Sequence, residues 1–139
     1  MTDENFDETR AKFLKHFSNG ITHKLILWII SKEPIHGYGI MKKLDEFFTF
    51  ENSACKMNFN SSKIYPILSK MEDKGLIVGE WKVNENNKRV KYYSITDEGI
   101  ELLNQIQNNM NKILNNPSWL AFFNDMTGLE INNEKCNRN

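Results

Sequence analysis

The spacing of hydrophobic residues predicts a chain built mostly from helices, with one short β-hairpin in its second half. Apolar side chains recur every three or four positions in six stretches, the spacing that creates one buried helical face. One stretch, Thr22–Lys32, is apolar nearly all round, which predicts a helix at the centre of the fold. The six predicted helices cover residues 7–18, 22–32, 36–48, 60–75, 96–114 and 118–131.

Polar residues and glycines mark the ends of several predicted helices. Asn60, Thr96 and Ser118 are predicted N-caps, because their side-chain oxygens can accept hydrogen bonds from N–H groups of the first turn. Asn19-Gly20 and Gly75 are predicted C-terminal ends, because both residue types tolerate a left-handed backbone. The predicted boundaries therefore rest on backbone hydrogen bonding as well as on hydrophobic spacing.

The hydrophobic period changes from helical to alternating after residue 76. Alternate positions that share one strand face are Ile77, Gly79, Trp81 and Val83, followed after a turn by Lys91, Tyr93 and Ile95. The turn between them, Glu85–Asn87, is entirely polar. Two alternating segments joined by a short polar turn predict a β-hairpin.

Composition places the chain among single-domain globular proteins. It has 139 residues, of which 40% are hydrophobic and 26% are charged, values that exclude wholesale disorder. The longest apolar run, Leu25–Ile30, is much shorter than the ~20 residues of a membrane helix, and the N-terminus is acidic rather than signal-like. We therefore expect a soluble, cytoplasmic protein that does not engage a membrane.

No signature of catalysis or metal binding is visible in the sequence. There is no phosphate loop, no HExxH and no paired-cysteine motif, and the histidines are scattered. Cys55 and Cys136 provide neither a disulfide framework nor the spacing of a metal site, and a metal sensor built from them and a histidine is the weaker alternative. We expect a protein that is not an enzyme and has no cofactor.

Positive charge is unevenly distributed along the chain. The 18 basic and 18 acidic residues balance overall, but residues 56–93 hold eight bases and four acids. A local excess of this kind suggests an anion-binding face, although chance explains it equally well on charge alone.

Three short helices followed by a basic hairpin are the arrangement of a winged helix-turn-helix. A recognition helix needs a small, polar first turn to reach base edges in the major groove, and residues 60–63 meet that need. A hairpin wing supplies cations beside the DNA backbone, here Lys88, Arg89 and Lys91. An ordinary helix cap and a solvated turn explain each feature taken alone, so the order and spacing of the features carry the prediction.

Three ordered motifs resemble those of the PadR-like family of winged-helix transcriptional regulators. The motifs are Leu27–Ile30 with the turn His36-Gly37-Tyr38-Gly39, Ile64-Tyr65-Pro66-Ile67-Leu68 with its continuation to Ile77, and Lys91–Gly99. Together they span roughly residues 20–105, and three motifs in matching order are a specific signal. The chain departs from the family at Ser62-Lys63, where a small residue and threonine are common, and at Asn86-Asn87, where glycine is common.

The resemblance implies which residues lie against double-stranded DNA. Besides the three cations of the wing, they are Tyr38, Asn60, Ser61, Ser62, Lys63 and Tyr65. The phenol of Tyr65 is expected to point to a phosphate, with a place in the core as the alternative.

The resemblance also implies a homodimer formed by the helices outside the winged domain. The expected interface residues are Phe13, Phe17, Leu103, Ile106, Met110 and Ile113, the last four of which form a heptad seam. The alternative is that these helices fold back on their own domain. A small aromatic effector is expected beside Trp119, Phe122 and Phe123, which could instead be ordinary core residues.

We therefore predict a mainly α protein with a small β-hairpin, a winged helix-turn-helix with N-terminal and C-terminal dimerisation helices. The predicted segments are an amphipathic helix (1–20), the DNA-binding domain (21–96), the dimerisation helices (97–131) and a polar tail (132–139). The predicted function is a homodimeric, ligand-responsive transcriptional repressor. The alternative is a winged-helix module that binds another protein, and the salt dependence of DNA binding distinguishes the two.

Overall fold

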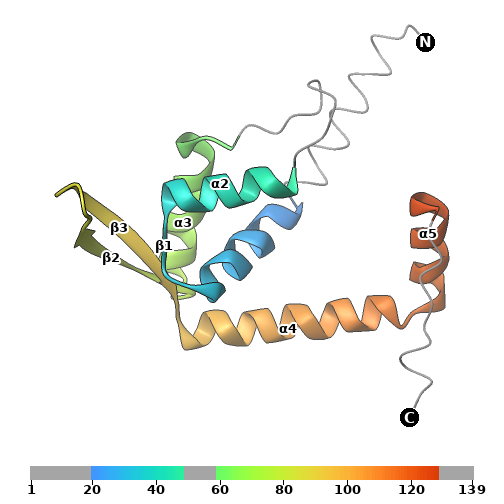
Figure 1. Ribbon diagram of the computed structural model, residues 1–139. Helices are drawn as coiled ribbons and strands as arrows, with labels where there is room; N and C mark the ends of the chain where they lie inside the picture. The colour runs from blue at the N-terminus through green and yellow to red at the C-terminus, as the bar shows by residue number, and fades with distance from the viewer. Residues whose placement is uncertain (1–19, 49–58, 129–139) are drawn as a thin grey trace, which may run out of the picture. The chain divides into compact units, whose positions relative to one another are not determined.

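The computed structural model describes residues 20–48 and 59–128, in which five helices and three strands are formed (Figure 1). After a helix over residues 20–32, the elements are β1 (Ile35–His36), α2 (Gly37–Phe47), α3 (Ser61–Asp73), β2 (Ile77–Val83), β3 (Arg89–Ile95), α4 (Asp97–Leu114) and α5 (Pro117–Thr127). The predicted class, mainly helical with one small hairpin, is confirmed. The chain divides into two compact units between Glu101 and Leu102. The helix predicted over 7–18 lies outside the described residues.

The core of the first unit is formed by isoleucine and leucine side chains from three helices and the start of β2. Each such side chain contributes roughly 1.5–3 kcal/mol when fully buried. Those with almost no exposed surface are Ile26, Leu27, Ile30, Ile40, Leu44, Ile64, Leu68 and Ile77. Three of them come from the helix over 20–32, as its predicted central place requires. Trp28 is the exception in that helix, since it is exposed and stands edge-on to the ring of Phe47 on α2.

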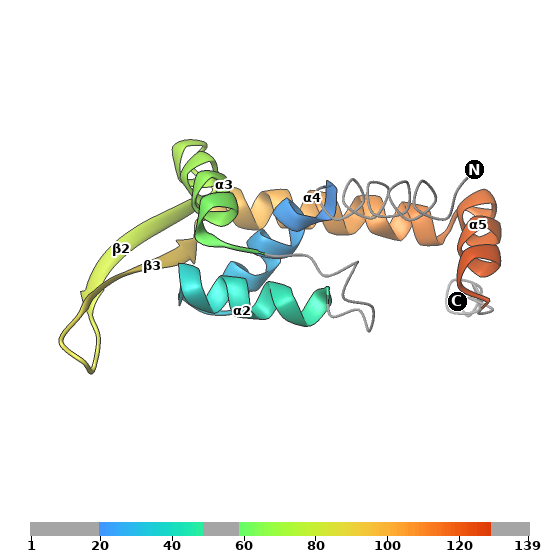
Figure 2. The same cartoon turned by 90° about the horizontal axis from the view of Figure 1, so that it is seen from above.

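β3 is the central strand of an antiparallel sheet with the order β1-β3-β2. β2 and β3 pair along their whole length, with Ile77 opposite Ile95, and form the predicted hairpin. Figure 2 shows this hairpin extending away from the helices as a wing. β1, which the sequence did not predict, pairs Ile35 with Tyr93 at the base of the wing.

Side-chain caps fix the starts of α2 and α3. Asn60 caps α3 as predicted, because its Oδ1 accepts a hydrogen bond of 3.2 Å from the N–H of Lys63. α3 stops before Gly75, whose φ of 76° lies in the left-handed region that favours glycine. His36 caps α2, its Nδ1 accepting a 3.1 Å hydrogen bond from the N–H of Gly39, so this histidine has a structural role.

One predicted helix boundary is wrong. α5 is capped by Asn116 rather than Ser118, and Asn116 Oδ1 accepts from the N–H groups of Ser118 and Trp119. The reason is Pro117, which is favoured at the first helical position and moves the cap one residue before it. Gly20 is the first described residue of the helix over 20–32, and the predicted end of the preceding helix at Asn19-Gly20 falls at the edge of the described residues.

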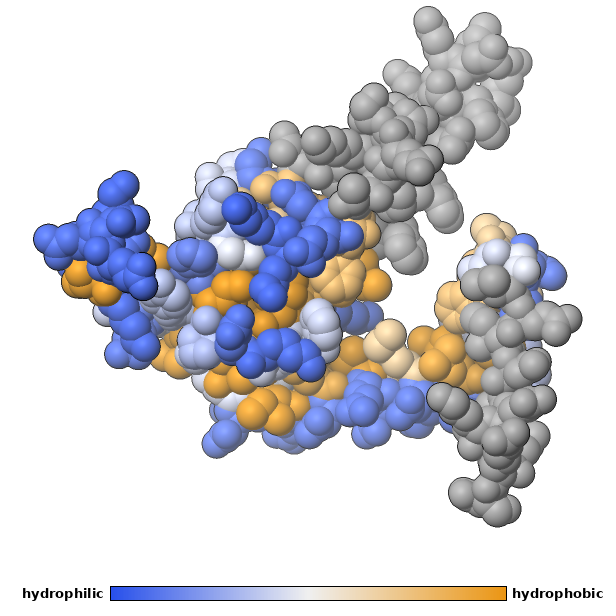
Figure 3. Space-filling model, viewed as in Figure 1, coloured by the Kyte–Doolittle hydropathy of each residue, from blue (hydrophilic) through white to orange (hydrophobic). Residues whose placement is uncertain are grey.

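α4 begins at the predicted cap and buries little of its surface. Thr96 Oγ1 accepts from the N–H of Gly99 at 3.1 Å and donates to the carbonyl oxygen of Gly75 at 2.6 Å. Gly99 is the one buried residue of α4 in the structure as described, and α5 has none. Figure 3 shows hydrophobic residues gathered along one side of α4. In the two described ranges, no helix is long and apolar enough to span a membrane.

Gly99 provides a test of how α4 is joined to the winged domain. A Cβ at this position would collide with the carbonyl oxygen of Leu76, which is backbone and cannot rotate away. We expect Gly99→Ala to lower the free energy of unfolding by about 1–3 kcal/mol in chemical denaturation. Gly20→Ala is the matched control, because nothing surrounds Gly20, and alanine there should raise stability by up to about 1 kcal/mol. Equal stabilities of Gly99→Ala and the wild type would contradict this account.

Candidate nucleic-acid interface

The first turn of α3 is exposed and carries short polar side chains. Asn60, Ser61, Ser62 and Lys63 are all exposed, so the structure brings these four predicted residues together on one surface. Asn60 Oδ1 accepts from Ser62 Oγ at 2.6 Å as well as from the N–H of Lys63. The ammonium group of Lys63 forms no ion pair with a described residue. A turn with these properties has the size and hydrogen-bonding capacity that major-groove recognition requires.

The tip of the wing is shaped by asparagine. Asn84 Oδ1 accepts from the N–H groups of Asn86 at 3.0 Å and Lys88 at 2.9 Å. Asn87 has a φ of 60°, the left-handed conformation expected for a turn in which asparagine replaces glycine. These bonds hold the tip in a defined turn with Lys88 exposed on it.

Arg89 is the first residue of β3 and lies over the indole ring of Trp81 on β2. Its guanidinium carbon is 5.3 Å from the ring centroid. Such a cation–π contact is worth about 0.5–1 kcal/mol at an exposed site and limits the directions in which the guanidinium points. Neither Arg89 nor Lys88 has an acidic partner in the described ranges, so both charges are available to a ligand.

Lys91, the third predicted cation of the wing, lies nearer its base, where its charge is paired. Lys91 Nζ is 3.1 Å from Glu72 Oε2, and the two side chains are about one third exposed. The Lys91 side chain crosses Gly79 on the neighbouring strand, which has no side chain to obstruct it. The ion pair ties the wing to α3 and leaves Lys91 with less unpaired charge than Arg89.

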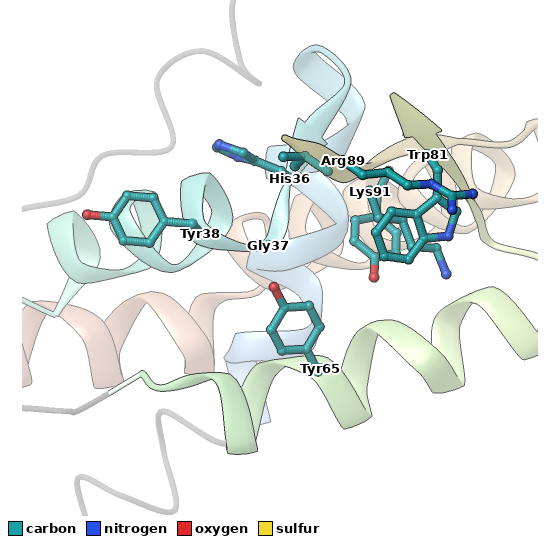
Figure 4. Close-up of a pocket in the computed structure, with 9 residues that line it drawn as sticks. His36, Gly37, Tyr38, Tyr65, Trp81, Arg89 and Lys91 are labelled. Atoms are coloured by element: carbon teal, nitrogen blue, oxygen red, sulfur yellow. The ribbon is translucent and has the colours of Figure 1, made fainter. Parts of the chain in front are cut away.

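Two tyrosines flank the start of α2 and α3, and both are exposed rather than in the core. Tyr38 is 59% exposed, with Lys42 Nζ 5.0 Å from its ring centroid. Tyr65 is directed toward Gly37, as Figure 4 shows, and a Cβ on that glycine would lie 2.7 Å from the Tyr65 hydroxyl oxygen. Glycine at position 37 therefore leaves the space that the Tyr65 phenol occupies.

A hollow of about 520 Å³ opens between the start of α2, the middle of α3 and the wing (Figure 4). We call it the α3–wing hollow, and its lining includes His36, Gly37, Tyr65, Trp81, Arg89 and Tyr93. Burial raises the pKa of the Tyr93 phenol, so this group is neutral near pH 7. Within residues 20–48 and 59–128, no three metal-ligating side chains gather into a site.

Sequence reasoning missed the place of Trp81 beside Arg89, and it assigned Tyr92 and Tyr93 to packing of the wing rather than to contacts with DNA. Tyr92 stacks on His36 with ring centroids 5.5 Å apart and planes 7° apart, so the turn that begins at His36 is in direct contact with the wing. The alternating pattern put Trp81 and Tyr93 on definite strand faces. Their neighbours, however, are set by strand register and by α3, which a local pattern does not reveal.

The predicted dimer residues of α4 lie on a face with little cover. Leu103, Ile106 and Ile113 are partly buried, and Met110 is 55% exposed. The other two predicted interface residues, Phe13 and Phe17, lie outside the described residues.

The predicted effector residues form one aromatic cluster on α5. Trp119 stacks on Phe123 with centroids 5.8 Å apart and meets Phe122 edge-on at 6.0 Å. Trp119 and Phe122 are exposed, and Phe123 is partly so. The three rings therefore contact one another along the side of a single helix.

Comparison with known proteins places this geometry in a family. A family model described as "Transcriptional regulator PadR-like family" matches residues 26–105. A PadR-like transcriptional regulator from Bacillus cereus is 31% identical, with a TM-score of 0.58 over 70% of this chain and 88% of that one. No curated protein sequence matches the chain.

Two further solved structures share the fold. A PadR family regulator from Eggerthella lenta has a TM-score of 0.62 and 24% identity, covering 81% of this chain and 91% of its own. A protein from Streptococcus mutans has a TM-score of 0.54 and 27% identity, covering 66% of this chain and 76% of its own. The family model covers more than half of the chain and the motifs lie where a winged helix needs them, so the chain belongs to the PadR-like family of transcriptional regulators, a DNA-binding family and not a family of enzymes.

Proposed function

We propose that this chain is a sequence-specific, DNA-binding repressor that acts as a homodimer and responds to a small aromatic effector. The observation that carries the proposal is the exposed polar turn at the start of α3, flanked by a wing whose tip cations have no acidic partner in the described ranges. A helix with this first turn fits the major groove, and a cationic hairpin fits the backbone or the minor groove.

The proposed contacts divide into base contacts and backbone contacts. Asn60, Ser61, Ser62 and Lys63 are directed to base edges and adjacent phosphates from the start of α3. The backbone contacts are proposed for Tyr38, Tyr65, Lys88, Arg89 and Lys91. Because Glu72 neutralises part of the Lys91 charge, Lys91 should contribute less to affinity than the two residues at the tip.

A homodimer is proposed because one winged helix covers only one half-site. Two recognition helices on a twofold axis reach successive major grooves about one helical turn apart, which multiplies affinity and specificity. The partly covered apolar face of α4, formed by Leu103, Ile106, Met110 and Ile113, supports this proposal.

Regulation is proposed to come from the aromatic cluster of α5. A ligand that packs against Trp119, Phe122 and Phe123 would change DNA affinity if it binds the DNA-bound and the free arrangements of the dimer unequally. A dimer bound over a promoter blocks transcription, and an effector that favours the free arrangement would relieve the block.

The contact surface is tested on DNA recovered from random oligonucleotides by selection with the wild type. We expect Lys63→Ala and Arg89→Ala each to bind this DNA roughly three- to tenfold more weakly, with a logarithmic salt slope about 0.9 unit shallower, because each removes one phosphate contact. Lys112→Ala, a lysine on α4 outside the proposed face, is the control and should bind like the wild type.

Two outcomes would overturn the contact surface or the function. Unchanged affinity and slope in both variants would show that the α3 turn and the wing tip are not the DNA-binding surface. Failure of the wild type to retain any DNA, or an affinity independent of salt, would favour a module that binds another protein.

The dimer is tested by placing a charge on the apolar face of α4. We expect Ile106→Glu to sediment as a 16.3 kDa monomer and to lose at least tenfold in DNA affinity, because a carboxylate on this seam opposes close packing. Asn108→Glu, on the exposed side of α4, should remain dimeric, and circular dichroism shows whether both variants keep their helices. An Ile106→Glu variant that remains a dimer would place the interface elsewhere.

The aromatic cluster is tested with the fluorescent probe anilinonaphthalene sulfonate. We expect the wild type to enhance the fluorescence of the probe several-fold more than Phe122→Ser, because the cluster presents accessible ring faces. Phe47→Ser is the control, since Phe47 is equally exposed but lies on α2. Equal loss of fluorescence enhancement in the two variants would mean that the cluster has no special affinity for aromatic ligands.

A further inference from the structure

The α3–wing hollow contains hydrogen-bond donors that the fold itself does not use. Tyr93 is only 4% exposed, and its hydroxyl forms no hydrogen bond with a described residue. No fully buried side-chain oxygen or nitrogen in the described ranges lacks a partner. The Tyr93 oxygen is therefore not fully buried, and Tyr93 lines the hollow, where its hydroxyl can donate to a ligand.

A second phenol, that of Tyr65, lines the same hollow and has room there because residue 37 is a glycine. The Tyr65 ring extends from α3 toward α2, where its hydroxyl occupies the space that a Cβ at Gly37 would need. This hydroxyl also has no hydrogen-bond partner in the described part of the chain. Two neutral donors thus face one hollow from α3 and β3.

The charge in the hollow comes from Arg89. Lys91 also lines the hollow, but its ammonium is paired with Glu72, so the two charges largely cancel. Arg89 has no such partner in the described ranges, and Trp81 supports its guanidinium from one side (Figure 4). One cation and two hydroxyl donors are the complement of a single anionic group with several acceptor oxygens.

We propose that the α3–wing hollow receives one phosphate group of the DNA backbone, with the Tyr65 and Tyr93 hydroxyls donating to its oxygens and Arg89 neutralising its charge. Trp81 is a positioning residue in this site, since it acts through Arg89. The source of the phosphate is DNA rather than a small phosphate compound, because the hollow lies between the two elements that meet the duplex. The proposal rests on the proposed function and adds Tyr93 and Trp81 to the residues that serve it.

The isosteric variants Tyr93→Phe and Tyr65→Phe test the donors. Each removes one oxygen and no charge, so we expect binding about five- to tenfold weaker with an unchanged salt slope. Arg89→Ala should differ from these two variants, because it removes a charge and so also makes the salt dependence of DNA affinity shallower. Tyr92→Phe is the matched control, because Tyr92 is the neighbouring tyrosine but does not line the hollow, and this variant should bind DNA like the wild type.

Trp81 is tested through its dependence on Arg89. We expect Trp81→Leu to weaken binding two- to fivefold, Trp81→Phe to retain most of the affinity, and Trp81→Leu to have no added effect in an Arg89→Ala background. An additive effect would mean that Trp81 contacts DNA itself, which contradicts its assignment as a positioning residue.

Methylphosphonate substitution identifies the phosphate. When backbone phosphates are neutralised one at a time, we expect one position per half-site at which the wild type loses affinity. At that position Tyr93→Phe, which already lacks the hydrogen bond, should lose no further affinity. Calorimetry with inorganic phosphate alone should show no binding below the millimolar range, and micromolar binding would overturn the DNA source. If the wild type and Arg89→Ala behave as proposed but Tyr93→Phe binds like the wild type, this inference fails while the proposed function stands. If the wild type binds no DNA, both fail.

Discussion

The arrangement of the interface depends on the pairing of β1 with β3. β1 is only two residues long, Ile35 and His36, and it pairs with β3, the strand that forms one side of the wing. α2 begins at the next residue, and His36 is both its cap and the platform on which Tyr92 stacks. The start of α2 and the base of the wing are therefore fixed to one another by backbone hydrogen bonds, whatever happens at the tip.

A second link attaches the same strand to α3. The ion pair between Lys91 and Glu72 joins residues 19 positions apart in sequence, and Gly79 leaves the space through which the lysine passes. Partly exposed ion pairs contribute little to stability, about 0–1 kcal/mol. Its importance is geometric, because it joins the wing to the helix that is proposed to enter the groove.

The parts of the fold that the sequence predicted are those with local causes. The α3 cap at Asn60, the stop at Gly75 and the hairpin follow from side-chain hydrogen bonding, backbone preference and alternation within a few residues. The cap of α5 was misplaced because Ser118 looks like a cap when Pro117 is ignored. β1 was missed because two residues cannot show a period, and the Lys91 pairing because its partner is supplied by α3. The DNA contacts, the dimer face and the effector cluster remain predictions.

The length of the wing sets where its unpaired charge is delivered. At roughly 3.3 Å per residue, Arg89 lies about 7 Å nearer the tip of the wing than Lys91, whose charge is paired with Glu72. The length of the hairpin thus sets the distance between the paired charge of Lys91 and the unpaired charges at the tip. Lengthening both strands of the hairpin by two residues between these two positions would move Arg89 about 7 Å farther from the Lys91–Glu72 ion pair, without changing a side chain at the tip.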